Sequence, residues 1–383
     1  MSTAGTSRTY RLCLWLHRWC SLVATVPFLV LCLTGTVLVF HEEIDAALGV
    51  VPAAPGLSAA QRPLAESVDA VLAAHPGRRI IFLGLDPDHH PGLLLLNTAP
   101  MGETGFDHAT LHFTDLATAR PIDASAANGT TFTGLLLELH AQWFLGPLGE
   151  LLGAFFALLV LVSLLSGLVV YWPYVKKVAL GVLRRGKAQR LRQLDLHNTI
   201  GVVVLGWALA VTLTGFLLGF GTLATGLWSQ QELGRVQQLH SGEPVDAQRP
   251  PVDADRAYRA AQAAAPAGWH VSSMLWPGTD YATPRHYTVL VGGSGLDARL
   301  VRVVLVDAAT GEVAGITELP WYLKAITLSE PLHFGDYGGM PLKILWTVCT
   351  WLTLFITANG AWLWWDRRRK RPARSTAVKG AMP

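Results

Sequence analysis

The chain is poor in charged residues. Only 15% of its 383 residues are Asp, Glu, Lys or Arg, whereas about 25% is usual for a soluble domain. Hydrophobic residues make up 51%, and the formal net charge is only +3. This composition excludes a disordered chain, and it excludes a nucleic-acid-binding protein, which needs a dense basic surface. We therefore expect the protein to contact a lipid bilayer and to bind no nucleic acid.

Cysteine is also scarce. The four cysteines, Cys13, Cys20, Cys32 and Cys349, lie in or beside long apolar runs, and the polar segments between those runs contain none. No CxxC pair is present. A disulfide framework and a cysteine-based metal site are therefore excluded.

Uncharged apolar runs are the main feature that is present. Four windows reach the length of about 20 residues that crosses the hydrocarbon core of a bilayer, at 19–40, 151–175, 198–231 and 344–365. The first follows several arginines but has no small-residue cleavage site, so we interpret it as a retained helix and not as a signal peptide. The sequence predicts four transmembrane helices.

Basic residues cluster beside these windows, and their distribution predicts the orientation. Because Lys and Arg are enriched on the cytoplasmic side, both termini and the short middle loop are expected there. The basic residues are Arg8, Arg11 and Arg18; Lys176, Lys177, Arg184, Arg185, Lys187, Arg190 and Arg192; and Arg367, Arg368, Arg369, Lys370 and Arg371.

The full predicted order follows from these spans. It is a cytoplasmic N-terminus with the first transmembrane helix (1–41), a periplasmic domain (42–145), the second helix (146–175), a basic cytoplasmic loop (176–196), the third helix (197–231), a second periplasmic domain (232–340), the fourth helix (341–366) and a basic cytoplasmic tail (367–383).

The two halves of the sequence resemble each other. Leu16-His17 is followed at fixed offsets by Thr34-Gly35, as Leu196-His197 is by Thr214-Gly215. In the same way, Leu139-His140 leads to Ser166-Gly167 and Leu332-His333 leads to Asn359-Gly360. We interpret the transmembrane part as two tandem parallel repeats.

The two long outside segments are predicted to form small α+β domains. Each has a helix-like stretch, at 59–74 and 253–265, followed by β-rich runs such as 79–85 and 300–306. Asp307-Ala308-Ala309-Thr310-Gly311 is typical of a turn between strands, and the first segment carries a degenerate copy with Ala119-Arg120 in place of Gly311-Glu312.

Four repeat-equivalent histidines are the strongest candidates for chemistry. His17 and His197 begin outward-going helices on the cytoplasmic side, whereas His140 and His333 precede inward-going helices on the outer side. Parallel repeats related by an axis along the membrane normal bring equivalent residues together. Two opposed imidazoles can bind one haem iron axially, so we expect one haem per pair. His41 also reaches the outer side and is an alternative outer ligand.

The glycines of the repeated motifs are expected to contact haem. Gly35 follows His17 by 18 residues, which is five helical turns, so it lies on the same face near the outer pair. The absence of a side chain leaves room for a porphyrin. The predicted haem contacts are Gly35, Gly215, Gly167 and Gly360.

These motifs resemble the PepSY-associated transmembrane family, and the outside segments resemble PepSY domains. In length and layout the chain looks similar to FoxB-type inner-membrane reductases of ferric siderophores. The resemblance implies two haems b, a ferric siderophore as substrate and a role in iron acquisition at the inner membrane of a Gram-negative bacterium. The electron donor stays open between a quinol, a flavin reductase and a soluble carrier. Reduction to ferrous iron releases the metal because siderophores hold ferric iron with hard oxygen donors.

The substrate is expected above the outer haem, lined by aromatic and soft residues near the outer span ends: Trp143, Phe144, Trp321, Tyr322, Tyr337 and Met340.

Two other functions stay open. An iron-siderophore transporter would need polar residues at mid-membrane, where these spans offer only Ser, Thr and Asn. A non-enzymatic PepSY regulatory protein would leave the four histidines without a task.

Overall fold

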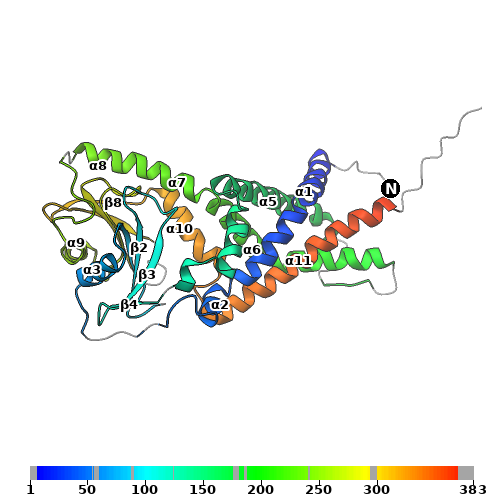
Figure 1. Cartoon of the computed structure of the whole chain (residues 1–383). Helices are drawn as coiled ribbons and strands as arrows, with labels where there is room; N and C mark the ends of the chain where they lie inside the picture. The colour runs from blue at the N-terminus through cyan, green and yellow to red at the C-terminus, as the bar shows by residue number, and fades with distance from the viewer. Residues whose placement is uncertain are drawn as a thin grey trace, which may run out of the picture.

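The computed structural model divides into a bundle of long helices and a β-sheet that lies beyond one end of the bundle (Figure 1). It describes residues 7–53, 55, 60–87, 90–123, 125–175, 181–184, 188–239, 242–293 and 300–369. Lys176, Lys177, Arg185, Lys187, Lys370 and Arg371, which entered the orientation prediction, lie outside these ranges.

Four long helices form the bundle and confirm the four predicted spans. Each is long and apolar enough to cross a membrane. Helix α1 lies against α5 and α11, and α6 lies against the same two helices. Their bounds are α1 (Arg8–Leu38), α5 (Pro147–Val175), α6 (Gln189–Leu218) and α11 (Gly339–Arg369).

The helix bounds differ from the apolar windows in two ways. Helix α1 begins at Arg8 and not at residue 19, because arginines form helix well although they do not raise hydropathy. The third span ends at Leu218 and not at residue 231. The chain leaves the helix at Gly219 and Phe220, and a separate helix, α7 (Gly221–Trp228), follows.

Short helices connect the bundle to the sheet. They are α2 (His41–Ala47), the 3-10 turn η1 (Ser125–Asn128), α4 (Phe132–Leu137), the π-helical turns η2 (Glu138–Gln142) and η3 (Ser229–Leu233), α8 (Gly234–Leu239) and α10 (Trp321–Phe334). Helices α7, α8 and α10 pack on one face of the sheet through a core that includes Trp228, Leu305 and Leu323. Helix α10 is therefore held between the sheet and the bundle (Figure 1).

One antiparallel sheet of eight strands contains both outside segments, in the order β4-β3-β2-β1-β5-β6-β7-β8. The strands are β1 (Arg78–Leu85), β2 (Leu93–Pro100), β3 (Thr110–Asp115), β4 (Pro121–Ile122), β5 (His270–Leu275), β6 (His286–Gly292), β7 (Arg302–Asp307) and β8 (Val313–Glu318). The halves join where Leu83 of β1 pairs with Met274 of β5. The two segments expected as separate domains thus share one sheet, because each leaves its first strand as an open edge.

Helices α3 (Leu64–Ala74) and α9 (Ala254–Ala264) cover the other face of the sheet. Helix α9 agrees with the predicted stretch 253–265 to within one residue at each end, whereas α3 begins only at Leu64. Residues 60–63 of the predicted stretch 59–74 are not helical, and Ala59 lies outside the described residues. The carboxylate of Asp255 in α9 accepts hydrogen bonds from the backbone N–H groups of Leu64 (2.9 Å) and Ala65 (2.8 Å). One half therefore caps a helix of the other half.

The predicted turn at Asp307–Gly311 joins β7 to β8. The Asp307 carboxylate accepts the Ala309 N–H at 2.7 Å, and Gly311 has φ +78°. In the degenerate copy between β3 and β4, Asp115 accepts the Ala117 N–H at the same distance, and Ala119 adopts φ +56°. The loss of glycine therefore strains this turn without abolishing it.

Candidate functional site

Two of the four candidate histidines meet inside the bundle, far from the sheet. The imidazole rings of His17 and His197 have centroids 6.3 Å apart. We name them the sheet-distal pair. Both lie well inside α1 and α6 and do not begin these helices as the sequence analysis expected, because the helices extend through the preceding basic residues.

A backbone carbonyl sets the tautomer of His17. Its Nδ1 lies 2.8 Å from the carbonyl oxygen of Ser163 in α5, and because a carbonyl only accepts, Nδ1 carries the proton. The lone pair is then on Nε2, as in metal-binding histidines. The Nδ1 of His197 is buried without a hydrogen-bond partner among the described residues.

A cavity of about 520 Å³ surrounds the sheet-distal pair. All four long helices line it, and both histidines and the glycines Gly167 and Gly360 are part of its wall. This volume falls within the range of about 300–1,000 Å³ that is usual for small-molecule and cofactor sites.

The other two histidines meet at the end of the bundle nearest the sheet. The ring centroids of His140 in η2 and His333 in α10 are 6.2 Å apart. We name them the sheet-proximal pair. Unlike the sheet-distal pair, both come from short helices that precede the spans α5 and α11, as the sequence predicted.

Both sheet-proximal imidazoles are anchored through Nδ1. His140 donates to the hydroxyl of Thr34 at 2.8 Å, since that hydroxyl itself donates to the Val30 carbonyl. His333 donates to the Val211 carbonyl at 3.0 Å, and its Nδ1 also lies 3.3 Å from the Thr214 hydroxyl. In both histidines Nε2 keeps the lone pair and is available to a ligand.

Each of the four predicted glycines lies behind one imidazole. A Cβ would come within 2.9 Å of Cε1 of His17 at Gly167 and of His333 at Gly215, and within 3.2 Å of Cε1 of His140 at Gly35 and of His197 at Gly360. The sequence analysis assigned these glycines to clearance for a porphyrin. In the structure they first make room for the imidazoles, because the helix backbone lies directly behind each ring.

A tight turn positions His140 on α5, and the sequence analysis did not identify it. After η2, Trp143 and Phe144 both adopt the left-handed conformation, with φ 50° and 56°, which is strained for aromatic residues. Helix α5 then returns so closely that a Cβ on Gly149 would overlap the backbone carbonyl of Gln142. The only available sequence signal was the pair of glycines around Pro147.

His41 is placed apart from the sheet-proximal pair. It is exposed at the first residue of α2, and its Nδ1 lies 2.9 Å from the Leu38 carbonyl. Within the part of the chain that the structure describes, no hydrogen bond or ring contact joins it to His140 or His333.

The predicted substrate residues are near the sheet end of the bundle but do not form one cluster. Ring contacts pair Trp321 with Tyr322, Tyr337 with Trp346, and Trp143 with Phe156. The most exposed is Trp321, at 80%; Phe144 and Met340 are also exposed. A substrate site at these residues stays a prediction.

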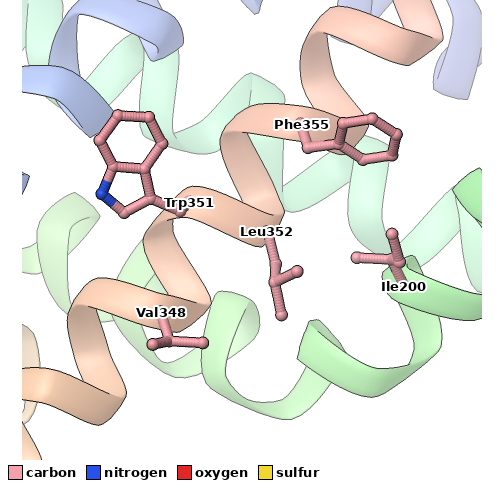
Figure 2. Close-up of a pocket in the computed structure, with 5 residues that line it drawn as sticks. All are labelled: Ile200, Val348, Trp351, Leu352 and Phe355. Carbon is pink, nitrogen blue, oxygen red and sulfur yellow. The ribbon is translucent and has the colours of Figure 1, made fainter.

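A second hollow lies on the outer surface of α6 and α11 and differs in chemistry from the cavity. Its lining is Ile200, Val348, Trp351, Leu352 and Phe355 (Figure 2). The indole N–H of Trp351 is the only polar side-chain group among them. This surface is suited to contact with lipid acyl chains.

The spacing of both pairs fits axial ligation of haem. A bond of about 2 Å from iron to each nitrogen, and about 1 Å from nitrogen to ring centre, place two axial imidazole centres about 6 Å apart. The observed separations are 6.3 Å and 6.2 Å. Ligation also requires a free Nε2 lone pair, and the anchored Nδ1 atoms of His17, His140 and His333 leave Nε2 free in these three imidazoles.

Comparisons with known proteins identify the family of this chain. A protein of Pseudomonas aeruginosa, named uncharacterized protein PA4219, is 28% identical over 258 residues, which are 62% of this chain and 64% of that protein. The chain thus spans less than two thirds of the relative's length. The model of the PepSY-associated TM region matches residues 14–367, from before the first histidine to the end of α11. The chain is therefore a multi-pass membrane protein and belongs to the PepSY-associated transmembrane family.

Proposed function

We propose that this protein is a dihaem membrane reductase that delivers electrons to ferric siderophores. The observation that carries the proposal is the presence of two half-buried imidazole pairs with ring separations of 6.3 Å and 6.2 Å at opposite ends of one bundle. Along α1, the 18 residues from His17 to Gly35, which lies behind His140, correspond to about 27 Å. Two haem sites at that spacing would lie near the two opposite faces of a bilayer.

The residues of this chain hold and orient the cofactor. His17 and His197 hold one haem b, and His140 and His333 hold the other. Bound haem supplies one-electron transfer. The carbonyls of Ser163 and Val211 and the hydroxyl of Thr34 keep three imidazoles in the tautomer that presents Nε2. Close packing of the glycines behind the rings limits the rotation of the imidazoles.

The sheet-distal end faces the cytoplasm in this proposal, and the sheet lies in the periplasm. Described basic residues gather at the sheet-distal end on three helices, including Arg8, Arg11, Arg192, Arg367 and Arg369. The positive-inside rule assigns such an end to the cytoplasm. Cysteine probes at residues 100 and 290 should react with an impermeant reagent added outside, whereas a probe at 186 should not. The opposite pattern would reverse the orientation.

The substrate is ferric iron held by a siderophore. One electron, taken from a quinol or a reduced flavin on the cytoplasmic side, converts ferric to ferrous iron in the periplasm, and the donor is oxidised. Ferrous iron is softer, so the hard oxygen donors of the siderophore release it. Trp321 and Tyr322 at the start of α10, with Tyr337, Met340, Trp143 and Phe144, are the proposed contact surface.

An absorption spectrum of the purified protein tests the cofactor, and oriented vesicles test the reaction. We expect two low-spin b-type haems. After anaerobic chemical reduction, ferric siderophore on the periplasmic face should reoxidise the protein, and a ferrous-specific chelator should capture iron at a matching rate. Absence of haem would contradict the proposal and favour the regulatory protein. Uptake of intact ferric siderophore with no ferrous iron outside would favour the transporter.

A further inference from the structure

The cavity of the sheet-distal pair is lined by charges of one sign only. Arg18, Arg190, Arg367 and Arg368 contribute to its wall, and none of its described lining residues is acidic. Guanidinium groups are strong hydrogen-bond donors to carboxylate and phosphate groups. Four guanidinium groups around an apolar cavity therefore indicate an anionic ligand.

Two of these arginines occupy related places around the histidines. Arg190 precedes His197 by seven residues on α6, and Arg367 follows Gly360 by seven residues on α11. Seven residues are two helical turns, or about 10 Å, so each arginine lies on the cavity face, beyond the pair in the direction away from the sheet. Arg18 lies next to His17 on α1. We name Arg18, Arg190 and Arg367 the arginine rim.

The chain itself neutralises the arginine rim only in part. Arg190 forms one long ion pair, in which its Nε lies 3.8 Å from the Asp366 carboxylate, and this Nε is buried without a hydrogen-bond partner among the described residues. No ion pair joins Arg18 or Arg367 to an acidic residue in the described ranges.

Arg184 lies near the same end of the bundle but outside the cavity lining. Unlike the arginine rim, it is neutralised by the chain. Its Nε and Nη2 donate to the two carboxylate oxygens of Asp195 at 3.0 Å and 2.7 Å, and Nη2 also donates to the hydroxyl of Tyr174. The chain thus supplies a complete partner set to Arg184 and leaves the arginine rim without one.

We propose that the arginine rim binds the two propionate carboxylates of the haem at the sheet-distal pair, with Arg190 and Arg367 as the main donors and Arg18 as a supporting charge. This inference rests on the proposed function. Haem carries both propionates on one edge of a flat apolar ring, and this combination matches a cavity that is apolar around the histidines and cationic at one end. The guanidinium fork suits a carboxylate because it can donate two parallel hydrogen bonds.

Reconstitution with modified haem tests this pairing. Apoprotein is titrated with haem b and with its dimethyl ester, which has the same ring but no carboxylate charge. Wild-type protein should hold haem b at the sheet-distal pair at least about tenfold more tightly than the ester, since hydrogen bonds between charged groups are the strong ones. The double variant Arg190→Gln/Arg367→Gln should lose this preference. Arg369→Gln, which removes an equal charge from the same helix end outside the cavity lining, should keep it.

A redox titration gives a readout that does not depend on affinity. Arg190→Gln alone should move the midpoint potential of one haem to more negative values, because a positive charge near the iron is lost, and should leave the other haem unchanged. Arg190→Lys should restore most of the potential, and Arg369→Gln should change neither.

Three results would overturn the inference, and they are distinguishable. Wild-type protein that binds no haem removes the proposed function as well. Equal binding of haem and ester, with unchanged potentials in Arg190→Gln, removes only the arginine assignment. Equal binding together with loss of co-purified anionic phospholipid from the double variant would assign the arginine rim to a lipid headgroup.

Discussion

The two histidine pairs have nearly the same ring separation but are built in different ways. The sheet-distal pair uses residues inside two spanning helices, and a cavity of about 520 Å³ surrounds it. The sheet-proximal pair uses residues at the ends of short helices, and each of its imidazoles is anchored to a spanning helix. The first site therefore depends on the bundle alone, whereas the second also depends on the packing of η2 and α10.

Replacing one histidine of each pair should have the largest effect. His197→Ala should remove or convert one of the two low-spin haems, and His333→Ala should affect the other, because a six-coordinate iron needs both axial imidazoles. The spectrum and haem content of each purified variant measure this, with a loss of about half the low-spin signal expected. His41→Ala is the control and should keep both haems. If His41→Ala loses a haem and His333→Ala does not, the sheet-proximal pairing is wrong.

Substituting the glycines should reduce haem occupancy to a smaller extent, which depends on the space between each glycine and its imidazole ring. Gly215→Ala places a Cβ 2.9 Å from His333, and Gly35→Ala places one 3.2 Å from His140. Overpacking of this kind costs about 1–3 kcal/mol, so Gly215→Ala should reduce occupancy of the sheet-proximal site more than Gly35→Ala. Haem content after size-exclusion chromatography measures it. Equal loss from both variants would mean that ring clearance does not control occupancy.

Removing a threonine hydroxyl that contacts a histidine should have a modest effect on the midpoint potential of the sheet-proximal haem. The effect should differ between His140 and His333. Thr34→Val removes the 2.8 Å hydrogen bond between Nδ1 of His140 and the Thr34 hydroxyl, which costs about 1 kcal/mol. Thr214→Val should cost less, because His333 keeps the Val211 carbonyl. The midpoint potential of the sheet-proximal haem, measured in both variants, should shift only in the first. A larger shift in Thr214→Val would contradict the anchoring scheme.

Acidification should lower the folding stability only slightly, which is the smallest of the predicted effects. It should cause haem to be released from the sheet-proximal site first. Burial, with the nearby His75 and Arg78 charges, lowers the pKa of His112 in β3 from 6.5 to about 4. The unfolded imidazole binds its proton first as the pH falls, so stability is complete above about pH 6.5 and is lost from there toward pH 4. At pH 6 the loss is below about 1 kcal/mol.

The thermal unfolding midpoint at pH 7.5 and at pH 6 measures this loss, with haem absorbance recorded in the same scans. His112→Gln should reduce the difference between the two pH values. Because α10 packs on the sheet, the sheet-proximal haem should be released before the sheet-distal one. Release in the reverse order would show that the two sites do not differ in their dependence on the sheet.

Much of this arrangement could be predicted from the sequence. Charge-free runs identify spans because a bilayer leaves few alternatives, and repeated spacing of His17 with Gly35 and of His197 with Gly215 indicated which residues would share a level. Both histidine pairs are close together in the structure as predicted. Whether they bind haem stays a prediction.

Other features could not be predicted because they depend on tertiary packing. The pairing of β1 with β5 joins edges that are almost 190 residues apart in the sequence, and no local pattern encodes it. Gly149 has no room for a side chain because the strained turn at Trp143 and Phe144 brings it against the Gln142 carbonyl, and this contact cannot be read from the sequence. The end of α6 was missed because Leu218 and Phe220 are apolar on both sides of the break at Gly219, so hydropathy shows no boundary there.

The β1–β5 ladder has a mechanical consequence for the whole molecule. Every histidine pair takes one ring from each half of the chain, and the ladder ties the halves together beyond the bundle. Alternating access requires one half to rock against the other, and such a movement would pull both ring pairs apart while it bent a continuous sheet. The architecture therefore favours a static frame, in which the two halves keep a fixed distance from each other.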